Sequence, residues 1–186
     1  MISIVIGGKT GIGRSIVEVL SVRGDEVFTF SRRKSKDKNH ISIDLSSKTS
    51  IKKIEDLLSN KLIDNLIFCH RYRGDDKKRE HQITVEVVSE IIETLKDKFK
   101  KNSSIVLLSS SASNFIYDEQ SLEYHTSRAA LESLMRYYSE RLGAQGIRCN
   151  CVLPGTIIKE ENKNFFTKNN PVTKLIKEIT PLNEIG

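Results

Sequence analysis

The sequence predicts an α/β fold, a doubly wound parallel sheet of the Rossmann type with helices on both faces, and three observations favour it. Apolar runs of strand length alternate with segments of helical periodicity almost to the end of the chain. The first run is apolar and β-branched throughout, as a strand covered on both faces should be. It is followed directly by a glycine-rich turn and a helix. A length of 186 residues fits one domain, and we expect residues 1–186 to form it.

The opening unit consists of a strand over residues 2–6, a turn over 7–13 and a helix that reaches Leu20. Glycines let the backbone bend tightly and approach a ligand closely, and the first-turn N–H groups and the dipole of the helix favour an anion. Such a unit at the start of an α/β pattern predicts a diphosphate-binding turn. The glycines in the turn are Gly7, Gly8, Gly11 and Gly13. Their spacing is neither Gly-x-Gly-x-x-Gly nor that of a P-loop.

The rest of the chain continues the alternation, and no internal repeat is visible. A polar loop over 71–81 separates the first half from the second, and the tail from residue 159 is polar apart from a short amphipathic piece near 172–179. Gly24 is the expected end of the first helix. The expected strands are 26–30, 40–43, 65–69, 104–108 and 147–153, and the expected helices are 50–60, 84–100 and 122–142.

Composition excludes several classes of function. The net charge is +6, but the lysines are scattered over predicted helix ends and loops and no nucleic-acid motif accompanies them. Three cysteines give no disulfide framework, and Cys149 and Cys151 alone make a poor zinc site, so no metal is expected. No apolar run is long enough to span a membrane, and the N-terminus reads as a strand rather than a signal peptide. We therefore expect a cytoplasmic protein that binds neither nucleic acid nor membrane.

The end of the second strand indicates which cofactor is used. In a dinucleotide-binding fold this position faces the adenosine ribose, where an acidic residue binds the 2′-hydroxyl and a basic residue accommodates a 2′-phosphate. Ser31, Arg32 and Arg33 stand there, with no acid, and Arg32 can hold a phosphate in a bidentate fork. The pattern favours NADP(H) over NAD(H). The alternative is that both arginines simply belong to a basic surface loop.

A tyrosine and a cation four residues apart open the helix over 122–142. Residues at this spacing share a helix face, so Tyr124 and Arg128 can reach the same point. A phenol is a poor acid–base catalyst at neutral pH, and a nearby cation favours its ionised form. Serines follow the strand over 104–108. In the short-chain dehydrogenase/reductase family, which this arrangement resembles, a serine after that strand bonds the substrate oxygen. Counting along the strand selects Ser110 for this role, whereas counting the family's usual gap back from the tyrosine selects Ser111.

These features together resemble the short-chain dehydrogenase/reductase family. Gly7, Gly11 and Gly13 match its Thr-Gly-x-x-x-Gly-x-Gly motif except that Ile6 replaces the threonine, and residues 124–128 match its Tyr-x-x-x-Lys except at the last position. The run 146–155, GIRCNCVLPG, closely resembles the sixth strand of the family and the Pro-Gly turn after it. The resemblance covers essentially the whole chain. It implies six strands in the order 3-2-1-4-5-6.

The resemblance also implies the cofactor contacts. The acid after the third strand, here Asp44, would receive the adenine amino group, and Lys9 stands one position before the basic residue often found in the turn. The tyrosine and the cation would hold the nicotinamide ribose, and residues after the Pro-Gly turn would follow the carboxamide. The full expected set is Gly7, Lys9, Thr10, Gly11, Ile12, Gly13, Ser31, Arg32, Arg33, Asp44, Leu45, Tyr124, Arg128, Pro154, Gly155 and Ile157.

Four departures from the family pattern stand out. Phe68-Cys69-His70-Arg71 replaces the family's Asn-Asn-Ala-Gly, and His70 is expected to be a loop or pocket-wall residue. The next helix lacks the asparagine that anchors a proton-relay water. Arginine replaces lysine at residue 128. The chain stops at Gly186, where family members continue into a further helix and a seventh strand, so we expect either a truncation or an oligomer that covers the exposed sixth strand.

The sequence thus predicts an NADP-dependent oxidoreductase that moves a hydride between the nicotinamide and a carbonyl or alcohol carbon of a small molecule. Tyr124 would be the general acid–base, Ser110 would orient the substrate oxygen, and Arg128 would supply charge and ribose contacts. The alternative is a catalytically degenerate NADP-binding protein with a sensing or scaffolding role. The resemblance also implies a homodimer or homotetramer. The substrate cannot be read from the sequence.

Overall fold

The computed structural model describes residues 1–168 and 170–186, which group into two compact units, Met1–Leu153 and Pro154–Gly186. The sequence predicts one domain over the whole chain, and that remains a prediction.

The first unit is built on a parallel sheet whose strand order is β3-β2-β1-β4-β5-β6, which confirms the predicted topology. Every pair of neighbouring strands is parallel. The order reverses between β1 and β4, where the chain crosses from one half of the sheet to the other. The strands are β1 Ile2–Ile6, β2 Glu26–Ser31, β3 His40–Ser42, β4 Ile63–Phe68, β5 Phe99–Leu108 and β6 Arg148–Val152.

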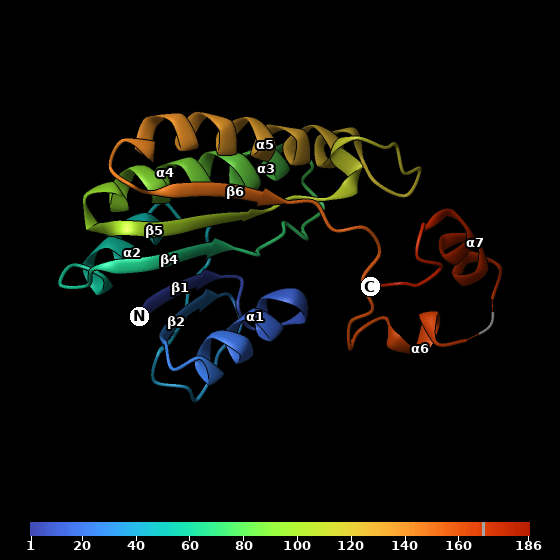
Figure 1. The fold of residues 1–186 in the computed structure, drawn as a ribbon, viewed down its shortest axis with the longest axis horizontal. Helices are drawn as coiled ribbons and strands as arrows, with labels where there is room; N and C mark the ends of the chain where they lie inside the picture. The colour runs from blue at the N-terminus through green and yellow to red at the C-terminus, as the bar shows by residue number, and fades with distance from the viewer. Residues whose placement is uncertain (169) are drawn as a thin grey trace. The chain divides into compact units, whose positions relative to one another are not determined.

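Helices cover both faces of this sheet, as predicted (Figure 1). Helix α1, Gly11–Val22, packs on one face, and α2, Ser50–Leu57, α4, Val87–Leu95, and α5, Leu122–Gly143, pack on the other. Short helical turns complete the described elements: α3 Lys78–His81, the π-helix η1 Gln82–Glu86, and the 3-10 turns η2 Lys96–Lys98 and η3 Ser111–Ser113. The second unit contains the short helix α6 Lys163–Phe166 and the longer helix α7 Pro171–Ile179.

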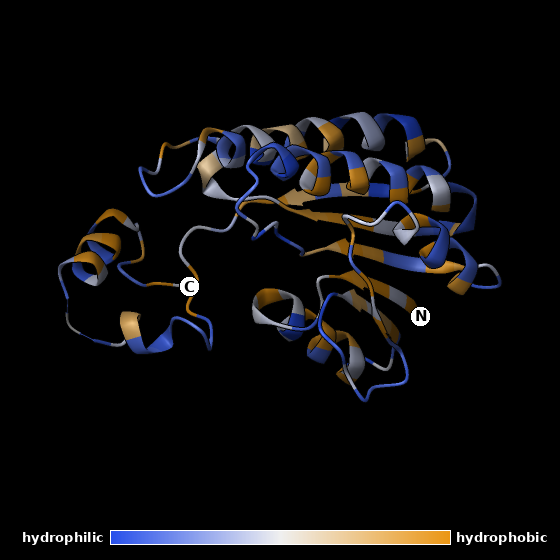
Figure 2. Ribbon diagram, turned by 180° about the vertical axis from the view of Figure 1, so that it is seen from behind, coloured by the Kyte–Doolittle hydropathy of each residue, from blue (hydrophilic) through white to orange (hydrophobic). Residues whose placement is uncertain are grey.

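The apolar core lies mainly between the sheet and the three helices α2, α4 and α5. The strands are largely hydrophobic, and the helices that cover them carry hydrophobic and hydrophilic residues along their length (Figure 2). A smaller cluster joins α1 to the other face, with Val5 and Ile67 from the sheet and Leu20 from the helix. The side chains buried most completely include Ile4, Ile6, Phe30, Leu66, Ile91, Ile105 and Leu107.

Most element boundaries differ from the expected ones by one to three residues, and two differ by more. The helix expected over 84–100 begins earlier, because α3 and η1 lead into α4 from Lys78, so the expected loop over 71–81 ends at Lys77. The strand β5 begins at Phe99 rather than at 104. In both places the residues added to the start of the element are mostly polar. The hydrophobic pattern of the sequence therefore does not predict them as part of the helix or strand. Gly24 follows α1 with φ +90° and donates its N–H to the Ser21 carbonyl, as expected for a helix end.

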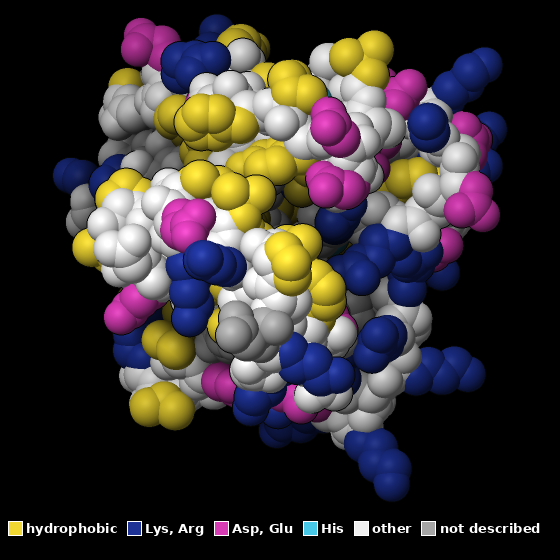
Figure 3. Space-filling model, turned by 90° about the vertical axis from the view of Figure 1, so that its right-hand side faces the viewer, with side chains coloured by type: hydrophobic (Ala, Val, Ile, Leu, Met, Phe, Trp, Pro, Cys, Tyr) yellow, Lys and Arg dark blue, Asp and Glu magenta, His cyan; other side chains and the backbone are white. Residues whose placement is uncertain are grey.

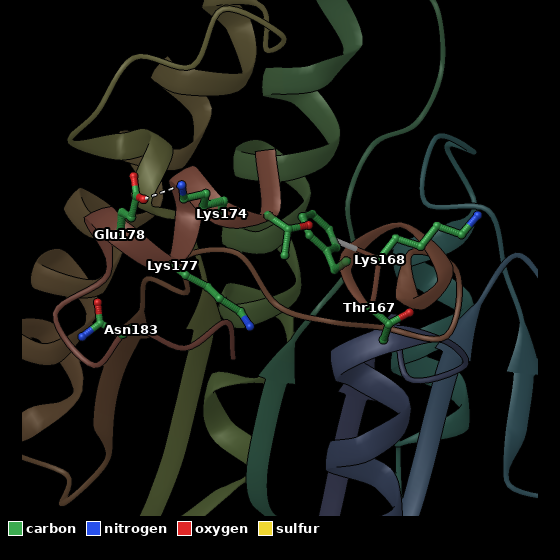
Figure 4. Close-up of a pocket in the computed structure, with 8 residues that line it drawn as sticks. Thr167, Lys168, Lys174, Lys177, Glu178 and Asn183 are labelled. Carbon is green, nitrogen blue, oxygen red and sulfur yellow. Dashed lines mark ion pairs between the residues drawn. The ribbon is translucent and has the colours of Figure 1, made fainter. Parts of the chain in front are cut away.

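The second unit closes on itself through backbone hydrogen bonds. Ile158 N–H donates to the Gly186 carbonyl at 2.6 Å, and Gly186 N–H donates to the Thr156 carbonyl at 3.2 Å. Helix α7 begins at the predicted amphipathic piece, and the Asn170 side chain caps it by accepting from Thr173 N–H at 2.8 Å. A hollow of about 430 Å³ lies between α6 and α7, with an ion pair of 3.8 Å between Lys174 and Glu178 on its wall (Figure 4).

The surface carries many cationic side chains, in agreement with the net charge of +6. One face shows Lys and Arg side chains gathered with acidic and hydrophobic ones between them (Figure 3). Within the described residues, no helix combines the length and the apolar character that crossing a bilayer would need. Nor do the described residues include a group of three or more His, Cys, Asp or Glu side chains placed to hold a metal ion.

Candidate active site

The predicted site residues of the first unit lie at the carboxyl ends of the strands, around the place where the strand order reverses. The glycine turn follows β1, His70 follows β4 closely, and Ser110 follows β5. In open parallel sheets, ligands bind in the crevice at this edge and at this reversal. The topology therefore brings the turn, the serines and the start of α5 toward one edge of the sheet, as the sequence predicts.

The glycine turn is packed so tightly that side chains are excluded from it. A Cβ on Gly7 would lie 2.6 Å from the backbone nitrogen of His70, and a Cβ on Gly13 would lie 2.3 Å from the Gly7 carbonyl oxygen. Gly7 and Gly11 also have positive φ angles, +87° and +53°. These glycines are needed for the turn to fold against β4 and against itself, so substitution at either packed position would distort the turn.

The N-terminus of α1 fits a bound phosphate. The first turn of α1 contains no acidic residue, and the preceding Thr10 makes no side-chain capping hydrogen bond. The backbone N–H groups around Ile12 therefore keep the favourable field of the helix dipole without a competing side-chain acceptor. The residues present thus fit the diphosphate of a dinucleotide in the predicted place.

Basic residues from two segments flank the end of β2. Lys9 of the glycine turn donates from Nζ to Ser35 Oγ at 2.7 Å, and Arg32 and Arg33 are exposed beside that loop. His40 Nε2 donates to the Arg33 carbonyl at 2.6 Å and fastens the loop to β3. The Lys9–Ser35 hydrogen bond thus ties the glycine turn to the loop that follows β2.

Asp44 follows β3 and is held in a local turn. Its Oδ1 accepts from Ser46 N–H at 2.9 Å and from Ser46 Oγ at 2.8 Å. These hydrogen bonds, with a smaller contribution from the charge of Arg32, hold the pKa of the Asp44 carboxyl below its usual range against the effect of partial burial. A carboxylate kept ionised suits the predicted contact with an adenine amino group. Leu45 packs against the core, and Ser31 Oγ lies 3.4 Å from His40 Nε2.

Tyr124 and Arg128 meet on the first turns of α5, as their spacing predicts. The Arg128 Cζ atom lies 4.8 Å from the centroid of the Tyr124 ring. The Ser121 side chain caps the helix by accepting from Tyr124 N–H at 3.3 Å, which fixes the start of α5 and therefore the tyrosine. The contact is a cation–π contact, in which the guanidinium of Arg128 packs against the ring of Tyr124.

Arg128 is buried in a network that the sequence does not reveal. Its Nη2 lies 3.4 Å from Glu80 Oε1, and its Nη1 donates to the Leu108 carbonyl at 3.2 Å. Thr84 Oγ1 donates to the same Glu80 oxygen at 2.9 Å. Burial lowers the pKa of Arg128, while the neighbouring Tyr124 and Glu80 raise it. The guanidinium stays charged because Glu80 supplies a buried counter-charge.

Arg71 is a second cation on Tyr124, and it was missed by the sequence analysis. Its Cζ lies 4.5 Å from the centroid of the Tyr124 ring, and its Nη2 donates to Gln120 Oε1 at 2.7 Å. Glu80 was missed as well, because it falls in the segment expected to be loop. The available signal was the replacement of the family's glycine by Arg71; nothing in the sequence pattern indicates that Glu80 is buried.

His70 forms part of the wall behind the site. Its Nε2 donates to the Ile83 carbonyl, in the π-helix, at 2.8 Å, and burial lowers the pKa of the imidazole to about 4. The ring is therefore neutral at pH 7 and carries its proton on Nε2. Its Nδ1 is buried and has no hydrogen-bond partner among the described residues.

The three serines after β5 have different partners. Ser109 is buried and donates to the backbone carbonyl of Arg128 at 2.8 Å, which ties β5 to α5. Ser110 Oγ accepts from Ala112 N–H at 3.2 Å, and Ser111 Oγ lies 2.9 Å from the hydroxyl of Tyr117. Whether Ser110 or Ser111 orients a substrate stays a prediction. Pro154, Gly155 and Ile157 belong to the second unit, so their expected cofactor contacts also stay predictions.

Comparisons with known proteins bear on the family and the fold of this chain. Residues 68–186 match a family model described as enoyl-(acyl carrier protein) reductase. An L-rhamnose 1-dehydrogenase (NAD(P)(+)) of Sphingomonas sp. is 39% identical over 45% of this chain and 32% of that enzyme. A sorbitol-6-phosphate 2-dehydrogenase of Klebsiella pneumoniae is 27% identical over 98% of this chain and 83% of that enzyme. The chain thus spans about a third of the length of the rhamnose dehydrogenases that it matches.

Solved structures share the fold over the whole chain. A short-chain dehydrogenase family protein of Francisella tularensis has a TM-score of 0.83 and 24% identity, with 100% of this chain and 85% of that chain covered. The NADP complex of RhlG from Pseudomonas aeruginosa has a TM-score of 0.82 and 22% identity, with coverage of 100% and 83%. Fold, site and family model together define the class, a nucleotide-binding α/β oxidoreductase family. The chain belongs to the short-chain dehydrogenase/reductase family.

Proposed function

We propose that this chain is an NADP-dependent oxidoreductase that transfers a hydride between the nicotinamide and a carbonyl or alcohol carbon of a small molecule. The observation that carries the proposal is the placement of Arg128 against the Tyr124 ring, 4.8 Å from its centroid, at the strand edge where the glycine turn also lies. The curated relatives support the class of reaction, since they are named as dehydrogenases of a sugar and of a polyol phosphate.

The residues of the chain handle the proton and the orientation of the substrate. A bound nicotinamide would supply or accept the hydride. In the reducing direction the Tyr124 hydroxyl gives its proton to the carbonyl oxygen, and in the oxidising direction the phenolate takes the proton of the alcohol. Arg128 holds the ring of that tyrosine through a cation–π contact. Ser110 bonds the same substrate oxygen, because its hydroxyl hydrogen has no acceptor among the described residues, whereas Ser111 is paired with Tyr117.

The preference for NADP(H) rests on the charges around the end of β2. Lys9, Arg32 and Arg33 surround that position, and no acidic side chain stands at the strand end to take a 2′-hydroxyl. The fit of α1 to a diphosphate supports a dinucleotide of either kind, so only these cations bear on the choice between NADP(H) and NAD(H).

The test is binding followed by turnover. The purified protein is titrated with NADPH and NADH by calorimetry, and oxidation of NADPH is then followed at saturating cofactor with aldoses, ketoses and polyol phosphates. We expect tighter binding of NADPH than of NADH and turnover of at least one carbonyl compound. The absence of binding of either cofactor would contradict the proposal.

A second candidate function, NADP binding without catalysis, is favoured by one observation. The Arg128 guanidinium is buried and already engaged by Glu80 and the Leu108 carbonyl, so fewer of its donors remain for a ribose than a free lysine would have. On this reading the protein binds NADPH and serves as a sensor or scaffold. Tight NADPH binding with no turnover across the carbonyl panel would select this candidate.

We also propose that the chain forms a homodimer or homotetramer. The outward faces of α4 and α5 are the surfaces by which the family resemblance implies association, and Tyr137 and Leu122 of α5 are exposed large side chains. Light scattering at micromolar concentration tests this proposal. A monomer under those conditions would contradict it.

A further inference from the structure

A cavity of about 300 Å³ lies beside Tyr124 in the first unit. The segment after β4 and the start of α5 line it. This volume is at the lower end of small-molecule sites and suits a substrate of a few carbon atoms. Its lining residues include Arg71, Lys77, Glu80, Gln120 and Tyr124. Because Tyr124 forms one wall, a molecule in this cavity lies against the proposed acid–base group.

Arg71 gives this cavity an uncompensated positive charge. Its Nη2 bonds the neutral Gln120 amide at 2.7 Å, and its Cζ lies 4.5 Å from the Tyr124 ring centroid. In the part of the chain that the structure describes, the other donors of this guanidinium have no acceptor, and no carboxylate pairs with it. A guanidinium held by stacking on one side and by an amide on the other is oriented, and its remaining N–H groups match a phosphate or carboxylate.

The acidic side chains of the cavity do not cancel this charge. Glu80 is paired with the buried Arg128, so the pair contributes no net charge. The remaining lining charges are the cations Arg71 and Lys77 and the anion Asp75, which is exposed to solvent. The cavity is therefore positive overall, and the cation that touches Tyr124 from the solvent side is Arg71.

We propose that this cavity holds the anionic group of the substrate, and that the substrate class is therefore a small hydroxy or keto compound that carries a phosphate or a carboxylate. This inference rests on the proposed oxidoreductase function and names the substrate for that same site. Arg71 binds the anion in a fork, Lys77 adds a second charge, and the carbonyl or alcohol carbon faces the Tyr124 hydroxyl. Arg71 stands where the family pattern has a glycine, so the preference belongs to this chain.

The experiment compares matched substrate pairs. Turnover is measured at saturating NADPH or NADP for a polyol phosphate, its unphosphorylated parent and a short hydroxy acid with its amide. We expect kcat/KM at least tenfold higher for the anionic member of a pair. Arg71→Gln should lower that preference about tenfold or more, because it removes a charge-assisted contact, and Arg71→Lys should restore part of it. Lys53→Gln on α2, an exposed lysine, is the control for net charge and should leave the preference unchanged.

A binding measurement separates this inference from the proposed function. Inorganic phosphate is titrated into the NADPH-saturated protein, whose cofactor phosphate sites are filled, and the melting temperature is followed. Stabilisation that is lost in Arg71→Gln but kept in Lys53→Gln supports the anion site even if no substrate turns over. Stabilisation that persists in Arg71→Gln, or turnover with equal kcat/KM for charged and neutral partners, would overturn the inference while leaving the oxidoreductase proposal standing.

Discussion

The Nη2 atom of Arg128 lies 3.4 Å from Oε1 of Glu80, and both side chains are almost completely buried, with exposed fractions of 4% and 9%. The pair joins α5 to α3, two helices that are far apart in sequence. It explains how an arginine is accommodated where the family has a lysine, because a buried guanidinium needs a counter-charge and hydrogen-bond acceptors. Glu80 therefore acts as a positioning residue for Arg128.

The first prediction is that removing Glu80 destabilises the fold. Glu80→Ala leaves the Arg128 charge buried without a partner, which costs about 3–5 kcal/mol of the free energy of unfolding. Urea denaturation measures this loss. The matched control is Glu93→Ala, which breaks the exposed pair with Lys96 and should change the free energy of unfolding by less than about 1 kcal/mol. Equal losses in the free energy of unfolding for both variants would show that the buried pair stabilises the fold no more than the exposed pair.

The second prediction concerns the dependence of stability on pH. Burial lowers the pKa of His70 in the folded state to about 4, from about 6.5 in the unfolded chain, so between these values the unfolded state binds the extra proton. The stabilisation is complete above pH 6.5 and is lost as the pH falls toward 4, by roughly 3 kcal/mol. His70→Gln keeps a donor for Ile83 and should flatten this part of the profile.

The control for the pH dependence of stability is His81→Gln. His81 is an exposed histidine at the end of α3. The free energy of unfolding of this variant should fall between pH 6.5 and 4 as steeply as that of the wild type. Urea denaturation at several pH values in this range provides the comparison. A His70→Gln profile parallel to that of the wild type would contradict a neutral, buried His70.

The third prediction concerns the cofactor. Arg32→Ala removes the bidentate partner of a 2′-phosphate, a contact worth about 1.5–3 kcal/mol, so NADPH should bind about 10- to 100-fold more weakly while NADH binding stays nearly constant. Calorimetric titration of both cofactors measures this. Lys38→Ala, in the same basic loop, is the control. Equal losses for NADPH and NADH would remove Arg32 from the 2′-phosphate site.

The fourth prediction concerns the acid–base group. Tyr124→Phe keeps the ring against Arg71 and Arg128 but deletes the hydroxyl, so turnover should be abolished while NADPH still binds. Single-turnover oxidation of NADPH provides the measurement. Tyr117→Phe, which deletes the hydroxyl paired with Ser111, is the matched control and should retain turnover. Full activity in Tyr124→Phe would refute the assignment.

The choice between the serines gives a fifth prediction. Ser110→Ala should lower kcat sharply, because it removes a hydrogen bond to the substrate oxygen, and Ser111→Ala should have a small effect. The two variants are compared at saturating NADPH with the best carbonyl substrate. The reverse order would assign the role to Ser111, which the spacing from Tyr124 selects.

Much of the architecture was predictable because it depends on local patterns. The apolar run at Ile2–Ile6, the glycines after it and the periodicity of α5 fix strand, turn and helix through short-range sterics and burial. The parallel sheet and its order followed from the alternation and from the family resemblance. The pairing of Tyr124 with Arg128 was predictable for the same reason, since residues four apart on a helix always share a face.

Only the tertiary structure decided what surrounds that tyrosine. Glu80 lies in a polar stretch whose sequence indicates a loop. Arg71 follows β4, in a segment whose residues differ from the family pattern. The fold nevertheless brings both side chains to α5. The partners of a charged side chain depend on which distant segment the fold sets against it, and hydrophobic periodicity carries no information about that. The sequence by itself determined the sheet, the glycine turn and the Tyr124–Arg128 pair, whereas long-range packing decided the counter-charge of Arg128 and the second cation on Tyr124.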